Sequence, residues 1–82
     1  MKKGNYEVAL RKYTRAIEEA KVENPIYYGN RAQTQFQLKE YEKCIKDCDE
    51  AIRVDPKFMK SYYRKSMAYR KLDDHLMSLW TA

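Results

Sequence analysis

The sequence predicts an all-α protein built from antiparallel helical hairpins that stack side by side. The chain of 82 residues contains only two glycines and two prolines, and few valines or threonines, which leaves little turn and strand chemistry for a β fold. Apolar residues recur at helical spacing, and two types of segment each recur after about 34 residues. Helices are expected at about 5–22, 26–38, 41–54 and 58–72, with a weaker, degenerate fifth from about residue 74.

The first and third expected helices carry the same apolar stripe. Its positions follow i, i+3, i+4, i+7, i+10 and i+11, which is one face of a helix. In the first helix the stripe consists of Tyr6, Ala9, Leu10, Tyr13, Ala16 and Ile17. In the third helix it consists of Tyr41, Cys44, Ile45, Cys48, Ala51 and Ile52. The small members of both stripes allow close approach of neighbouring helices, so these faces are expected to form the core.

The two stripes belong to an internal repeat with two interleaved elements. At a shift of 35 residues the identical pairs are Tyr6/Tyr41, Glu7/Glu42, Ala16/Ala51 and Ile17/Ile52. At a shift of 34 the matching pairs are Tyr28/Tyr62, Asn30/Arg64, Arg31/Lys65, Ala32/Ser66 and Leu38/Leu72. Pro25 is expected in the first turn of the second helix, and Asp55-Pro56 is expected to end the third. This pattern predicts a helical solenoid.

Composition excludes several classes of function. The chain has no glycine-rich phosphate loop and a single histidine, His75, so no catalytic site and no cofactor are expected. Cys44 and Cys48 lie at i, i+4, where a regular helix does not offer disulfide geometry, and they are expected to be buried, reduced and without metal in a cytoplasmic protein. No apolar run approaches the roughly 20 residues that a membrane span requires. The net charge of +5 fits either solvated helix faces or a groove for an acidic partner.

The repeated stripes resemble the second helix of the tetratricopeptide repeat, with cysteines replacing the usual alanine and aromatic residue in the second copy. The resemblance implies a right-handed α-solenoid. It divides the chain into the second helix of one repeat (4–22), a complete repeat (25–56), and the first helix with a partial second helix of a further repeat (57–82). In this register the first helix of the first repeat is missing. His75, Ser78 and Ala82 stand where an aromatic residue or alanine is expected, so the chain resembles a truncated array.

The segments 27–32 and 60–65 resemble the carboxylate-clamp class of these repeats, which holds acidic C-terminal peptides of the 70 kDa and 90 kDa heat-shock chaperones. By position the matching clamp residues are Asn30, Lys60 and Arg64. Helical spacing continues the groove lining to Gln33, Gln37, Met67 and Lys71. The resemblance implies two further clamp residues on the missing helix. Their loss is expected to cost roughly 3–6 kcal/mol of binding.

Two alternatives stay open. The chain could be a general repeat scaffold, or a self-associating segment that binds no chaperone tail. Nucleic-acid binding is less favoured, because Tyr6, Tyr13, Tyr28, Tyr41 and Tyr62 occupy repeat-core positions. This leaves Tyr27, Tyr63 and Tyr69 exposed. Arg31 and Lys65, which follow the clamp positions, are expected to point away from the groove.

A repeat array without capping elements leaves apolar faces bare, so the chain is expected to self-associate or to be marginally stable. Leu76, Leu79 and Trp80 are expected either to be exposed or to pack on another chain. Sedimentation velocity over a range of protein concentrations measures this association. A stable, monodisperse monomer at every concentration would contradict the expectation.

Overall fold

Helices make up nearly all of the part of the chain that the structure describes. A computed structural model of the protein describes residues 3–81, and the side chains of residues 4–74. The helices are α1 (Lys3–Glu19), α2 (Pro25–Gln37), α3 (Tyr41–Val54) and α4 (Met59–Thr81). Residues 3–81 contain no strand, so the predicted all-α class is confirmed.

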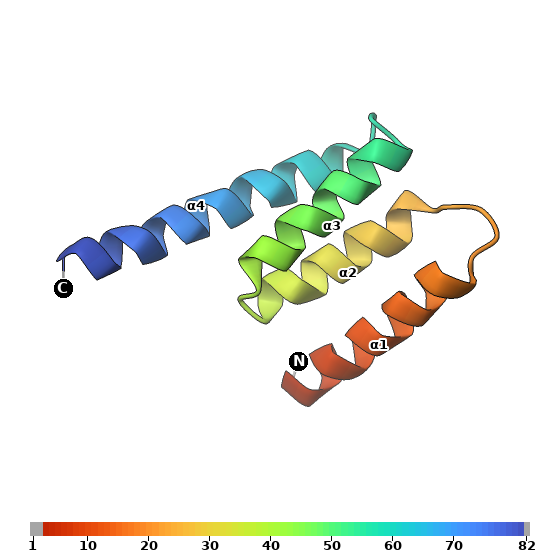
Figure 1. Cartoon of the computed structure of the whole chain (residues 1–82), viewed down its shortest axis with the longest axis horizontal. Helices are drawn as coiled ribbons and strands as arrows, with labels where there is room; N and C mark the ends of the chain where they lie inside the picture. The colour runs from red at the N-terminus through yellow and green to blue at the C-terminus, as the bar shows by residue number, and fades with distance from the viewer. Residues whose placement is uncertain (1–2, 82) are drawn as a thin grey trace.

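The helices stack in chain order as antiparallel hairpins. Figure 1 shows α1, α2 and α3 side by side, with α4 starting beside the C-terminal end of α3, running back along it and extending beyond the stack. Each helix packs on the next one in the sequence, and α4 also contacts α2. Since α3 packs on both α2 and α4, it is the central element of the stack.

Local sequence signals fix both ends of α2. The Asn24 side chain accepts a hydrogen bond from the backbone N–H of Ile26 at 2.9 Å, and Pro25 occupies the first helical position, as predicted. At the other end Lys39 adopts a left-handed conformation with φ of 63°. The N–H of Glu40 then donates to the carbonyl of Gln35 at 2.8 Å, which closes the helix and turns the chain into α3.

The turn from α3 to α4 follows the predicted Asp-Pro signal. Asp55 has extended backbone, which the following Pro56 favours. The Asp55 carboxylate accepts a hydrogen bond from the N–H of Lys57 at 3.0 Å, and its carbonyl accepts one from the N–H of Phe58 at 3.0 Å. These bonds hold the start of α4 next to the end of α3.

Helix α1 ends at Glu19, earlier than the expected end near residue 22. The residues that follow form a loop, in which Glu23 pairs with Arg53 of α3 at 2.7 Å. Arg53 also binds Glu50 at 2.8 Å. The loop therefore crosses to α3 before the chain enters α2, which a longer α1 would prevent.

Helix α4 is longer than expected, and the separate fifth helix predicted from about residue 74 does not form within residues 3–81. Helix α4 instead continues to Thr81. Two features explain the difference. No glycine or proline lies between Leu72 and His75 to end the helix. The apolar stripe with which α3 packs back on α2 is also weak in the corresponding segment from about residue 74. The side chains of Leu76, Leu79 and Trp80, on which self-association was predicted, lie outside the described residues.

The core lies where α3 meets its two neighbours. Its buried apolar members are mostly small, which permits close helix packing: Ala32, Cys44, Ile45, Cys48, Ala51 and Ala68. The predicted core face of α3 is thereby confirmed. The stripe of α1 is only half-buried, because α1 packs on α2 alone.

An ion pair on α2 joins three helices. The guanidinium of Arg31 donates to both carboxylate oxygens of Asp47 on α3, at 2.6 and 2.7 Å. It also donates to the hydroxyl of Thr14 on α1 at 3.3 Å. Asp47 is only 4% exposed, so its charge depends on Arg31 for compensation.

Replacing this buried carboxylate should destabilise the whole stack. Asp47→Ala leaves the half-buried Arg31 without its partner and is expected to lower the free energy of unfolding by about 3 kcal/mol. Urea denaturation followed by circular dichroism measures the change. The matched control is Glu19→Ala, which breaks the exposed Arg15–Glu19 pair and should cost less than about 0.5 kcal/mol. Equal effects of the two changes would contradict this account.

Candidate binding groove between α2 and α4

A hollow in the described structure lies between α2 and α4. Its volume is about 490 Å³. It forms because both helices pack on α3 and face each other across the space that this leaves. The lining combines apolar and cationic groups: Ile26, Gly29, Asn30, Gln33, Phe58, Lys60, Ser61, Tyr63 and Arg64.

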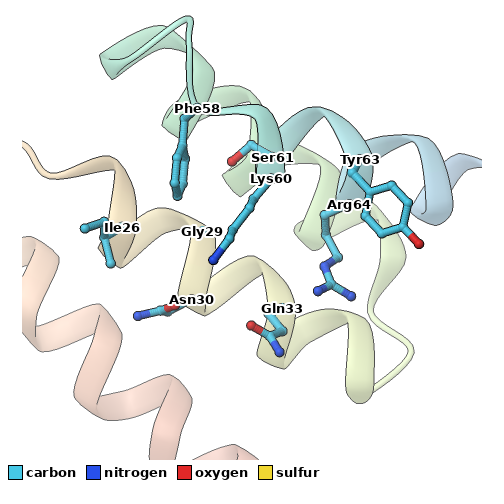
Figure 2. Close-up of a pocket in the computed structure, with 9 residues that line it drawn as sticks. All are labelled: Ile26, Gly29, Asn30, Gln33, Phe58, Lys60, Ser61, Tyr63 and Arg64. Atoms are coloured by element: carbon cyan, nitrogen blue, oxygen red, sulfur yellow. The ribbon is translucent and has the colours of Figure 1, made fainter.

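The structure brings four of the predicted site residues into this one cavity wall. Asn30 and Gln33 come from α2, and Lys60 and Arg64 come from α4. Figure 2 shows the Lys60 side chain reaching from α4 towards Asn30, with the Arg64 guanidinium one helical turn further along the groove. Among the described residues no carboxylate pairs with Lys60 or Arg64. The groove therefore offers two positive charges and two amides to an anion.

The other three predicted lining residues do not line this cavity. Gln37 is the last residue of α2, and beyond it α2 no longer provides a facing wall. Met67 and Lys71 lie further along α4, beyond the α4 residues that line the cavity. Lys71 is exposed and Met67 is half-buried.

An aromatic contact of Arg64 was missed by the sequence analysis. The guanidinium carbon of Arg64 lies 5.2 Å from the ring centroid of Phe36 on α2, within the range of a cation–π interaction. Phe36 in turn makes an edge-to-face contact with Tyr41, with 5.3 Å between the ring centroids. Sequence spacing gives no signal for a contact between two different helices, so this pair could not be predicted.

The apolar floor of the groove was also missed. A Cβ atom on Gly29 would lie 2.9 Å from Cε1 of Phe58, closer than ordinary packing allows. Gly29 therefore lets the Phe58 ring approach the backbone of α2. The signal was present, because a glycine inside a helix is unfavourable and often marks a close approach.

Arg31 and Lys65 point away from the groove, as predicted. Each forms an ion pair with α3: Arg31 with Asp47, and Lys65 with Asp49 at 2.5 Å. The hydrogen bond that Lys65 donates to Asp49 raises the pKa of Lys65, and the hydrogen bonds that Arg31 donates to Asp47 raise the pKa of Arg31. Both cations therefore stabilise the stack and are not available to a ligand.

Two tyrosine predictions are wrong. Tyr62 was assigned to the core as the counterpart of Tyr28, but it is 42% exposed. Tyr28 is half-buried in a hollow that residues of both α1 and α3 line, whereas no described helix covers the matching outer face of α4. Tyr63 and Tyr69 were predicted to be exposed, which is confirmed. Tyr27 was also predicted to be exposed, but it is half-buried.

The two cysteines are structural. Cys44 and Cys48 are free thiols with no exposed surface, which confirms their predicted burial. The hydrogen bond to Cys44 and the burial of the thiol both raise the pKa of Cys48. Within the described residues there is no group of three or more side chains suited to a metal ion. None of the helices described is both long enough and apolar enough to cross a membrane.

The central part of the chain matches a known family. The family model of the tetratricopeptide repeat matches residues 25–58, which cover α2, α3 and the turn into α4. Residues 25–58 are therefore similar to a tetratricopeptide repeat. The repeat thus provides the α2 wall of the groove, together with the central helix on which both walls pack.

Several curated proteins are similar to this chain. The chain is 44% identical over 64 residues to small glutamine-rich tetratricopeptide repeat-containing protein 2 of Saccharomyces cerevisiae, covering 78% of this chain and 18% of the relative. It is 36% identical over 77 residues to mitochondrial import receptor subunit TOM70 of Homo sapiens, covering 89% and 13%. It is also 44% identical over 59 residues to Hsp70/Hsp90 co-chaperone CNS1 of S. cerevisiae, covering 71% and 15%. The chain thus spans less than a fifth of the length of these relatives.

Thiol accessibility tests the packing between the repeat helices. Cys44 and Cys48 should react with a thiol reagent roughly 100-fold more slowly in the native protein than in urea, since exposure requires local unfolding and burial disfavours the thiolate. Mass spectrometry at timed intervals follows the labelling. Rapid modification of either cysteine in the native state would show that α3 is not packed as described.

Proposed function

We propose that the groove between α2 and α4 binds acidic peptides through their free C-terminal carboxylate, in the manner of a co-chaperone adaptor for the 70 kDa and 90 kDa heat-shock chaperones. One observation carries the proposal. Asn30, Lys60 and Arg64 line a single cavity, and among the described residues no acidic side chain lines it with them. Positive charge without an internal counter-ion favours an anionic ligand.

The chemistry of the lining suits a carboxylate. A carboxylate only accepts hydrogen bonds, and the ammonium of Lys60, the guanidinium of Arg64 and the amide of Asn30 can all donate. Arginine can hold both oxygens at once, whereas lysine supplies a point charge. Ile26 and Phe58 add apolar surface at the same cavity. The cationic groups would therefore bind the terminal carboxylate of a peptide. The apolar groups would contact an apolar side chain near that terminus, and an acidic side chain there would also find the cations.

The relatives support a protein partner without choosing one. One is named as an Hsp70/Hsp90 co-chaperone, and another as a subunit of a mitochondrial import receptor. Both names describe proteins that act with other proteins, which favours a peptide over a small metabolite as the ligand.

A second candidate function is that of a scaffold or self-associating repeat segment. The observation that favours it is the outer face of α4, where Tyr62 and Tyr69 are exposed. Exposed tyrosines are common where two proteins meet, because each combines a large apolar ring with a hydroxyl. This function would not depend on Lys60 or Arg64.

Peptide titration separates the two functions. A peptide ending in Glu-Glu-Val-Asp should bind as the free acid and lose most of its affinity when its C-terminus is amidated. Lys60→Ala and Arg64→Ala should each weaken binding roughly 10- to 100-fold, since a charge-assisted hydrogen bond contributes roughly 1.5–3 kcal/mol. Chemical-shift changes in nitrogen-15 NMR spectra measure binding up to millimolar dissociation constants.

The matched control for this titration is Lys57→Ala. Lys57 is exposed in the turn before α4 and does not line the cavity, so its removal changes net charge by the same amount without changing the groove. Equal affinities for the free acid and the amide, or equal losses in the Lys57, Lys60 and Arg64 variants, would exclude the carboxylate groove.

A further inference from the structure

Arg64 and Lys60 both line the groove, but their surroundings differ. Arg64 is half-buried, and its guanidinium carbon lies 5.2 Å from the centre of the Phe36 ring. Lys60 is exposed, and no aromatic contact of its ammonium occurs among the described residues. Of the two cations that the groove offers, one is therefore held by a ring on the opposite helix and the other is not.

We propose that Phe36 is a positioning residue of the groove: its ring holds the Arg64 guanidinium in place, and this sets how strongly the groove prefers a free carboxylate to an amide. The inference rests on the proposed carboxylate-binding function. Phe36 does not itself line the cavity, so it acts on a ligand through Arg64.

The first step of the argument is the freedom of an arginine side chain. A long side chain on a helix surface samples many rotamers and loses that freedom when it binds a ligand. Within the described residues, Arg64 has no carboxylate partner that would restrict it. The Phe36 ring takes this role, and a guanidinium that is already restricted loses less freedom on binding.

The second step is that ring contact leaves the hydrogen-bond donors available. A cation over a ring is attracted to the π face, whereas the five N–H donors of a guanidinium lie in its own plane. A carboxylate partner inside the protein would use up these donors, as Asp47 uses those of Arg31. Phe36 can therefore fix Arg64 without competing with a carboxylate ligand.

The third step is that the ring is itself fixed. Phe36 packs against the buried cluster of Ala32, Cys44, Ile45, Cys48 and Ala68. Its edge-to-face contact with Tyr41 spans the turn between α2 and α3. The carbonyl of Phe36 also accepts the hydrogen bond of the Lys39 N–H at 3.0 Å, within the same turn. The position of Arg64 is thus linked to the packing of the repeat.

The experiment compares the affinity of the full chain for the Glu-Glu-Val-Asp peptide with its affinity for the amidated form. Phe36→Leu should weaken binding of the free acid about five- to tenfold while changing that of the amide little. Phe36→Tyr keeps a ring and should restore the preference. Phe36→Met also removes the ring while filling a similar volume, so it should weaken binding in the same way as Phe36→Leu. It replaces Phe36→Leu in the experiment if that variant folds poorly. In an Arg64→Gln background, Phe36→Leu should have no further effect, because its role depends on the guanidinium.

The matched control is Tyr28→Leu. Tyr28 is also a half-buried ring of α2, and it makes the other guanidinium contact, with Arg31 at 5.9 Å, outside the groove. Its loss should leave the preference for the free acid unchanged. An equal loss of preference in the Tyr28 and Phe36 variants would mean that general destabilisation is responsible, and would overturn the proposal.

A measurement without ligand completes the test. The side-chain protons of Arg64 should be shifted upfield by the Phe36 ring current in the unmodified protein, and this shift should disappear in Phe36→Leu. Unshifted Arg64 protons in the unmodified protein would overturn the proposal. A preference for the free acid that survives Phe36→Leu would overturn it while leaving the carboxylate groove intact. Absence of that preference in the unmodified protein would overturn both.

Discussion

The ion pair between Arg31 and Asp47 is the contact on which the rest of the stack depends. Arg31 of α2 donates a charge-assisted, bidentate pair of hydrogen bonds to the Asp47 carboxylate, which is buried in α3. Arg31 also donates to the hydroxyl of Thr14, which adds α1 to the contact. A buried ion pair of this kind contributes little net energy compared with apolar packing, but it accepts only one arrangement of its donors. In a core of alanine and cysteine, where small side chains could slide past one another, that geometric demand fixes how the first three helices lie.

The Thr14 branch of this contact has a second copy because the sequence is repeated. Lys65 corresponds to Arg31 at a shift of 34, and Asp49 corresponds to Thr14 at a shift of 35. The Lys65–Asp49 pair is therefore the second copy of the Arg31–Thr14 contact, in which a cation of one helix binds a polar residue of the preceding helix. The Arg31–Asp47 pair joins α3 to α2, and the Lys65–Asp49 pair joins α3 to α4. Because α2 and α4 are both held on α3, the groove lies between them.

The sequence alone predicted the structural features that depend on residue spacing within one helix, or on proline and asparagine at helix ends. The helix order, the buried face of α3, and the shared wall of Asn30, Lys60 and Arg64 all follow from register. Phe36 and Phe58 escaped prediction because their contacts join different helices, at distances that only the packed structure defines. The predicted end of α4 was wrong because it was taken from the repeat spacing. A helix ends there only if the following segment packs back on it, and the repeat spacing does not show how strong that packing is.

The separation of roles between fixed and free cations has a consequence for selectivity. A groove with two freely moving lysines would attract any anion, since a point charge imposes little geometry. A groove with a fixed guanidinium instead demands that two oxygens lie in one plane at one place, which a terminal carboxylate satisfies and an amide does not. Under the proposed function, Lys60 would supply long-range attraction and Arg64 would supply discrimination. The aromatic pair of Phe36 and Tyr41 connects that discrimination to the α2–α3 turn, so the fold of the repeat and the selectivity of the groove depend on the same packing.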